Sequence, residues 1–173
     1  AWEQLLEQFG IQKPASGTTS KPDSNGGNTN DGVNGGTNQE GSGNGDSNAT
    51  TSAAQAILSR VNTARAQNGL SPLALDSAMT RAANVRAAEL AKRFSHTRPN
   101  GARGLTALAE AGVSYRAAGE NIAAGQQTAQ AVMAAWMNSS GHSANILSAK
   151  YSRLGVGQAV VGGRTYWVQL FAD

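Results

Sequence analysis

The sequence predicts an α+β domain in which helices cover a small antiparallel sheet. Apolar residues recur at helical spacing from residue 54 onward, and the chain changes to a two-residue alternation near its end. Residues 15–53, by contrast, are almost entirely Gly, Ser, Thr, Asn and Asp. We therefore expect one domain at 54–173, a flexible low-complexity linker at 15–53 and a separate short helix at 1–14.

The two segments before the domain differ in their apolar content. Residues 15–53 hold only one large apolar side chain, Val33, so they bury too little surface to offset the entropy of ordering. Residues 1–14 carry an apolar stripe at positions i, i+3, i+4 and i+7, which consists of Trp2, Leu5, Leu6 and Phe9. This stripe predicts a short amphipathic helix.

Two longer helices are expected at the start of the domain. Ser52 and Gln55 have the spacing of a capping box before an apolar stripe, and Gly69 stands where that helix would end. Asp76 is placed to cap a second helix that reaches about Lys92. The stripe of this second helix is rich in alanine, which allows close approach of a neighbouring element. Its members are Met79, Ala82, Ala83, Arg86 and Leu90.

The remaining elements are shorter. "GLTALAEAG" predicts a third helix that ends at Gly112, and "TAQAVMAAWMN" predicts a fourth helix capped by Thr128. The final "RLGVGQAVVGGRTYWVQLFA" predicts two antiparallel strands joined at Gly162-Gly163, and "GENIAAG" is a candidate for one further strand.

Composition excludes several classes of site. The absence of cysteine excludes disulfides, thiolate metal sites and cysteine nucleophiles. Residues 54–173 carry twelve Lys and Arg against five Asp and Glu, whereas residues 1–53 carry two against six. The basic residues form no patch interleaved with aromatic side chains, so we expect no nucleic-acid partner. The charge suits anionic envelope polymers or lipid headgroups, or simply solubility. No stretch approaches the roughly 18 apolar residues of a transmembrane segment.

Three residues are candidates for chemistry. His96 in "FSHTRPNG" and His142 in "SSGHSANIL" both lie in polar segments broken by Gly or Pro, and we interpret the second segment as a turn. Glu120 is a lone acid in "GENIAAG", on a strand from which its carboxylate would face a cleft. Two imidazoles and a carboxylate are the ligand types of an open zinc site, so Zn²⁺ or another divalent metal is a candidate cofactor. Glu120 has an alternative interpretation as a structural acceptor for backbone or Asn donors.

Two other enzyme classes lack their motifs. A serine hydrolase of the usual kind needs a G-x-S-x-G elbow, which the sequence does not contain. A glycosidase needs a second acid near Glu120. Within residues 54–173, the other acids before the C-terminal residue are Glu110, Glu89 and Asp76, and each is more simply a helix-surface or capping residue.

Five motifs agree with one known family. "FSHTRPNG", "GENIAAG", "AWMNSSGHSANIL", "LGVGQAV" and "YWVQLF" follow each other in this order. Together they resemble the bacterial branch of the CAP superfamily, also called the SCP-like extracellular domain, over about residues 54–173. The resemblance implies an α-β-α sandwich, with a three-stranded antiparallel sheet between helical layers and a cleft lined by His96 and Glu120. It also implies a secreted protein, either extracellular or in the cell envelope.

The sequence departs from the eukaryotic members, which have a cleft tetrad of two His and two Glu that can hold a divalent metal. Their second Glu lies in a W-x-x-E pattern that falls here on Ser139, and their second His falls here on Tyr166, three residues before Gln169. His142 belongs instead to a bacterial S-P-G-H-R-A-N-I-L pattern. The candidate cleft residues are His96, Glu120, Asn121, Ser139, His142, Tyr166 and Gln169, and the candidate metal ligands among them are His96, Glu120 and His142.

Three functional hypotheses follow from these residues. The first is a secreted bacterial CAP domain that binds a small molecule, lipid or peptide in the His96/Glu120 cleft. The second is metal-assisted hydrolysis by His96, Glu120 and His142. The third is a structural or adhesive protein of the cell envelope, in which the cleft residues brace loops through hydrogen bonds. The sequence leaves open whether the protein is an enzyme, and we expect a monomer.

Overall fold

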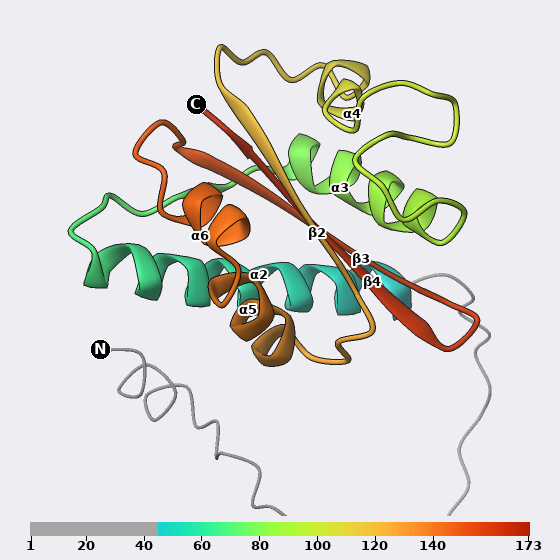
Figure 1. Ribbon diagram of the computed structural model, residues 1–173, viewed down its shortest axis with the longest axis horizontal. Helices are drawn as coiled ribbons and strands as arrows, with labels where there is room; N and C mark the ends of the chain where they lie inside the picture. The colour runs from blue at the N-terminus through green and yellow to red at the C-terminus, as the bar shows by residue number, and fades with distance from the viewer. Residues whose placement is uncertain (1–44) are drawn as a thin grey trace, which may run out of the picture. The chain divides into compact units, whose positions relative to one another are not determined.

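The computed structural model describes residues 45–173, with side chains from Ser52 onward. The predicted helix at 1–14 and most of the predicted linker lie outside the described residues. The first described helix, α2 (Gly45–Gln67), begins nine residues before position 54 (Figure 1). Ser52 therefore lies inside this helix and the prediction that it caps the helix is wrong, whereas the predicted end at Gly69 is confirmed by its φ of +69°.

The sheet has four strands in the order β1-β3-β4-β2. The three antiparallel strands that the sequence predicts are β2 (Ala118–Ala124), β3 (Arg153–Val161) and β4 (Arg164–Ala172). The predicted hairpin joins β3 to β4 through Gly162-Gly163. The strand count needs one correction, because β1 (Ala74–Leu75) pairs in parallel with the outer edge of β3. Two residues are too few to show a strand period in the sequence.

Helices cover both faces of this sheet, which confirms the α-β-α sandwich (Figure 1). On one face lie α3 (Ser77–Leu90) and α4 (Thr106–Glu110), and on the other lie α2, α5 (Ala129–Met137) and α6 (Ser140–Ile146). The alternation of β4 supplies both cores. Trp167 and Phe171 pack against α2 and α5, whereas Val168 and Leu170 pack in the core formed with α3 and α4.

The predicted helix ends agree with the structure in most cases. Asp76 and Thr128 each accept a hydrogen bond from the backbone N–H three residues later, and so cap α3 and α5. Gly112 follows α4 with a φ of +75°, a conformation that favours glycine.

Helix α3 approaches the sheet closely along its alanine-rich stripe. A Cβ atom placed on Gly155 would overlap the backbone of Met79, and one on Gly157 would overlap the backbone of Ala83. Arg86 lies on the same stripe and is completely buried. The stripe is therefore apolar except for one guanidinium, which faces the inside of the domain.

The segment "SSGHSANIL" is not the predicted turn, since most of it forms α6. This seven-residue helix has only one buried residue, Ile146, so its sequence carries no apolar periodicity that would have revealed it. Within residues 45–173, no helix combines the length and apolarity needed to cross a membrane.

Candidate binding cleft

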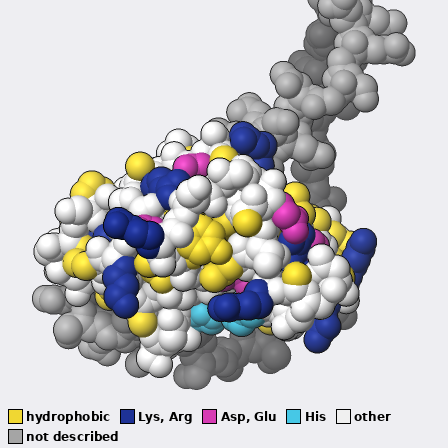
Figure 2. Space-filling model, turned by 90° about the horizontal axis from the view of Figure 1, so that it is seen from above, with side chains coloured by type: hydrophobic (Ala, Val, Ile, Leu, Met, Phe, Trp, Pro, Cys, Tyr) yellow, Lys and Arg dark blue, Asp and Glu magenta, His cyan; other side chains and the backbone are white. Residues whose placement is uncertain are grey.

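A cleft of about 610 Å³ opens between the loop after α3, the end of β2 and the helices α5 and α6. It brings together the two histidines, which are 46 positions apart in the sequence. Figure 2 shows their side chains next to each other at the surface. The residues that line the cleft are Phe94, Ser95, His96, Ile122, Ala123, Ala124, Gln126, Ala135, Trp136, Ser139 and His142. The lining is therefore mostly apolar, with the two imidazoles as its titratable groups.

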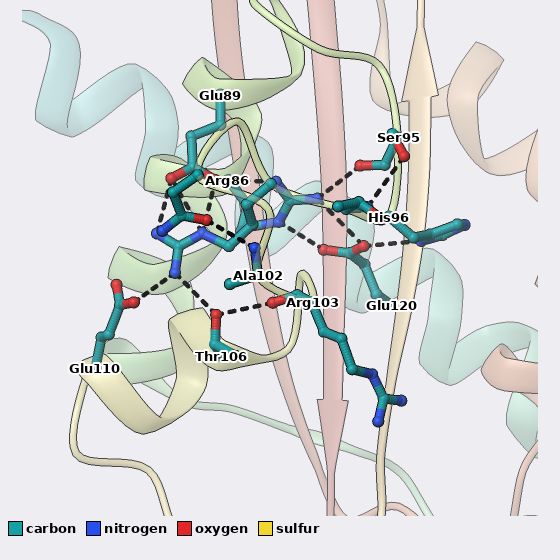
Figure 3. Close-up of polar contacts among 12 residues, drawn as sticks. Arg86, Glu89, Ser95, His96, Ala102, Arg103, Thr106, Glu110 and Glu120 are labelled. Atoms are coloured by element: carbon teal, nitrogen blue, oxygen red, sulfur yellow. Dashed lines mark hydrogen bonds and ion pairs between the residues drawn. The ribbon is translucent and has the colours of Figure 1, made fainter.

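Glu120 does not line this cleft, but its carboxylate contacts the ring of His96 (Figure 3). Its Oε1 atom is 2.8 Å from Nδ1 of His96, and the exposed fractions are 62% for the His96 side chain and 4% for the Glu120 side chain. A carboxylate can only accept a hydrogen bond, so Nδ1 of the neutral imidazole carries the proton. The other ring nitrogen, Nε2, is then a bare hydrogen-bond acceptor.

Arg86 holds Glu120 from the opposite side. Its Nε and one terminal nitrogen donate to the two carboxylate oxygens, at 2.8 and 3.3 Å, and its remaining donors reach Glu89 at 2.9 Å and the backbone oxygen of Ser95 at 3.0 Å. Burial by itself would lower the pKa of Arg86, but hydrogen bonds and opposite charges from Glu120 and Glu89 raise that pKa above its usual value. Arg86 therefore remains charged inside the domain.

A second arginine extends the network toward α4. Arg98 donates to Glu89 at 2.7 Å, to Glu110 at 2.6 Å and to the hydroxyl of Thr106 at 3.0 Å. Hydrogen bonds from Arg98, and then from Arg86, lower the pKa of Glu89 despite its partial burial. The loop that carries His96 is thus linked to both α3 and α4 by ion pairs.

Gly104 closes the network over the Glu120 carboxylate. A Cβ atom at this position would lie 2.5 Å from Oε1 of Glu120, which is closer than real Cβ contacts allow. The N–H of Gly104 also donates to the backbone oxygen of His96 at 2.7 Å. The backbone of the loop after His96 therefore covers the carboxylate, and a side chain at 104 would displace it.

His142 reaches the cleft by a different set of contacts. The Asn121 amide donates to the backbone oxygen of His142 at 3.1 Å and to the side chain of Gln169 at 3.0 Å, and Asn145 donates to Asn121 at 2.9 Å. Asn121 and Gln169 are completely buried. These amides fasten α6 to the sheet, so Asn121 and Gln169 support the cleft rather than line it.

Of the two remaining predicted cleft residues, only one lies in the cleft. Ser139 lines the cleft, whereas Tyr166 does not and instead lies under the guanidinium of Arg164, 5.7 Å from the ring centroid.

The pKa of His142 is lowered, first by burial and then by the neighbouring His96. Burial therefore favours the neutral form of the His142 imidazole.

Sequence reasoning missed two residues that support the cleft. Arg86 had a visible signal, because a lone arginine on an otherwise apolar helical stripe must find buried acidic partners. Asn145 had none, since its role depends on where α6 packs. No local pattern indicated that Phe94, Ile122 and Trp136 line one cleft, because these residues come from three separate parts of the chain.

The described residues do not fit a three-ligand metal site. Among residues 52–173, no group of three or more His, Cys, Asp or Glu side chains is arranged to hold a metal ion. Both oxygens of Glu120 accept hydrogen bonds from Arg86, and one of them also contacts His96. A metal at Glu120 would have to displace these donors.

Comparison with known proteins identifies the family. The family model for CAP, the cysteine-rich secretory protein family, matches residues 58–171. The chain belongs to this family. It is a CAP domain without any cysteine, so packing and hydrogen bonds stabilise it in place of disulfides.

Two proteins of Bacillus subtilis (strain 168) have similar sequences. The uncharacterized protein YkwD is 35% identical over 133 residues, which cover 72% of this chain and 51% of YkwD. The uncharacterized membrane protein YlbC is 33% identical over 124 residues, which cover 70% of this chain and 34% of YlbC. The chain thus spans about half of one relative and a third of the other.

Two solved bacterial structures share the fold. An extracellular protein with an SCP domain from Bacillus anthracis str. Ames has a TM-score of 0.68 and 28% identity, covering 78% of this chain and 45% of that protein. An outer surface protein of Borrelia burgdorferi has a TM-score of 0.63 and 20% identity, covering 69% of this chain and 90% of that protein. The family match and the similarity to the Bacillus anthracis protein confirm the resemblance to bacterial CAP proteins, and the Borrelia structure shows the same fold.

Proposed function

We propose that this CAP domain is a binding module that takes an amphipathic small molecule or a peptide in the His96/His142 cleft. The observation that carries the proposal is the composition of the lining, where Ile122, Trp136 and Phe94 offer apolar surface beside two imidazoles. Pockets of a few hundred Å³ with apolar walls and few polar groups are typical of small-molecule sites. The apolar part of the ligand packs against these walls, and its polar end binds the histidines.

The polar end of the ligand is a hydrogen-bond donor when both imidazoles are neutral. The contact with Glu120 leaves Nε2 of His96 as an acceptor, and the lowered pKa of His142 keeps the second imidazole uncharged. A hydroxyl or amide N–H suits a bare ring nitrogen, whereas a carboxylate does not, because both groups would be acceptors. An imidazolium has only hydrogen-bond donors, so a protonated ring would reverse this preference.

The proposed location of the protein is the cell surface or the extracellular space. Two proteins with the same fold are described as extracellular and as an outer surface protein. The basic charge of residues 54–173 is suited to a surface rich in anionic polymers or lipid headgroups.

The binding proposal is tested by NMR titration of ¹⁵N-labelled protein with 1-hexanol and with hexanoate, which share a tail but differ in donor capacity. At pH 7.5 we expect saturable shifts from 1-hexanol at the cleft residues, including the Trp136 indole, and weaker shifts from hexanoate.

Ala135→Leu fills the cleft and should weaken 1-hexanol binding about tenfold, the effect of losing ~1–2 kcal/mol of apolar burial. Ala131→Leu, at an exposed position on the same helix, is the matched control. The absence of saturable shifts from either probe would reject the binding role and favour the loop-bracing hypothesis.

Metal-assisted hydrolysis remains a rival proposal, supported by the two imidazoles that line one cleft. It needs Glu120 as a ligand or base, and the contacts from Arg86 and His96 count against this. Calorimetric titration with ZnCl₂ tests it on the wild type and on His96→Ala, His142→Ala and Glu120→Gln. Zinc uptake that is lost in all three variants, with their melting temperatures unchanged, would favour the rival.

A further inference from the structure

We infer that Arg86 is the positioning residue of the cleft, which fixes His96 with its Nε2 atom bare and supplies the positive charge beside Glu120 that a metal would otherwise provide. This role rests on the proposed function, because His96 is positioned for the ligand of the cleft. Arg86 itself is completely buried and does not line the cleft. It acts only through the groups that it holds.

The contacts of Arg86 fix His96 at two points. One is the side chain of Glu120, which accepts from Arg86 on both oxygens and from Nδ1 of His96 on one of them. The other is the backbone oxygen of Ser95, the residue directly before His96. The planar fork of an arginine can reach both at once, whereas the single ammonium of a lysine has no such geometry. Figure 3 shows Glu120 between Arg86 and His96, and of these three side chains only that of His96 is largely exposed.

The charge of Arg86 explains why Glu120 is tolerated inside the domain. A buried carboxylate without a partner is costly, and here it receives a guanidinium held in place by Glu89. Arg98 in turn pairs with Glu89 and Glu110. A divalent cation at Glu120 would lie within a few ångströms of this guanidinium and be repelled by it. The guanidinium therefore supplies the positive charge at this carboxylate and opposes the binding of a metal ion there.

The tautomer of His96 provides a direct readout that a purely structural role of Arg86 would not change. In the wild type at pH 7.5, ring ¹⁵N chemical shifts should show a protonated Nδ1 and a bare Nε2 on His96. Arg86→Met removes the fork and leaves the carboxylate mobile, so we expect the population with a bare Nε2 to fall severalfold. Arg86→Lys keeps the charge and should restore part of that population. Arg81→Met, at an exposed position on the same helix, should match the wild type.

A second variant keeps the test informative if Arg86→Met fails to fold. Arg86→Met combined with Glu89→Gln removes one charge of each sign, while Glu120 and His96 stay unchanged. Glu89→Gln alone is its control. A folded variant without Arg86 that keeps the wild-type ring signature of His96 would overturn the inference.

The zinc titration separates this inference from the proposed function. We expect Glu120→Gln and the matched surface variant Glu110→Gln to leave the zinc response of the wild type equally unchanged. Zinc uptake that disappears in Glu120→Gln but persists in Glu110→Gln would overturn the inference, because the carboxylate would then be a metal ligand. If 1-hexanol fails to bind while the ring signature depends on Arg86, the proposed ligand class is wrong and the positioning role still holds.

Discussion

Two neighbouring residues of β2 hold the two histidines of the cleft by different physical means. Glu120 faces α3, where its carboxylate is paired with Arg86 and contacts His96, whereas Asn121 faces α6 and holds His142 through neutral amides. The alternation of a strand sends adjacent side chains to opposite faces, so one short segment organises both layers of the sandwich. The position of His96 depends on the pairing of the buried ions Glu120 and Arg86, whereas the position of His142 depends on the packing of the short helix α6.

The largest expected effect is the loss of Arg86. Arg86→Met leaves Glu120 and Glu89 without their shared buried partner, and removing one member of a buried ion pair costs about 3–5 kcal/mol. Urea unfolding should show this loss as a lower midpoint with an unchanged slope. Exposed Arg81→Met is the control, and equal midpoints for the two variants would show that the buried network contributes no stability.

A smaller loss is expected where the backbone covers the carboxylate. Gly104→Ala forces a methyl group against Glu120 and should destabilise the domain by about 1–3 kcal/mol through overpacking. The matched substitution is Gly141→Ala in α6, where a Cβ atom meets nothing within 4 Å. That variant should be neutral or more stable by up to about 1 kcal/mol, because alanine favours a helix. Thermal unfolding of the pair measures the difference, which vanishes if the loop at 104 moves aside freely.

Loss of an amide contact around Asn121 should have a smaller and more local effect than loss of a charged group. Asn145→Ala leaves the side-chain oxygen of Asn121 without its donor, at a cost of about 1–2 kcal/mol. The NMR signals of His142 and α6 should change while those of His96 stay in place. Ser143→Ala in the same helix is the control, since the Ser143 hydroxyl makes only an exposed local bond. Equal changes at both histidines would mean that the two networks are coupled.

The smallest effect concerns pH. The folded-state pKa of His142 lies below 6.5, the ordinary value of the unfolded chain, because of burial and then of His96. Between these two values the unfolded state binds more protons than the folded state. The contribution of His142 to the free energy of unfolding is therefore fully present above pH 6.5 and decreases as the pH is lowered through that window. Solvent screening of the partly exposed ring keeps the effect well under about 1 kcal/mol. Thermal melts from pH 7.5 to 5 should show a shallower decline in His142→Gln than in the wild type, and parallel curves would contradict the prediction.

Local signals predicted much of this fold. Asp76, Thr128, Gly69 and Gly112 marked helix ends because capping and left-handed glycine conformations depend on nearby residues. The alternation in β4 revealed a strand, and its apolar residues on both faces agree with two cores. The sequence did not reveal β1 or α6, since two residues show no period and α6 buries only Ile146.

The candidate site was predicted in part. The sequence by itself determined that His96, Glu120 and His142 are unusual, and that a chain without cysteine must rely on packing and hydrogen bonds. Only the tertiary structure decided that His142 joins His96 in one cleft and that Glu120 is held behind it by Arg86. The physical reason is that pairing of buried charges depends on distances between elements far apart in the chain, which no local pattern encodes.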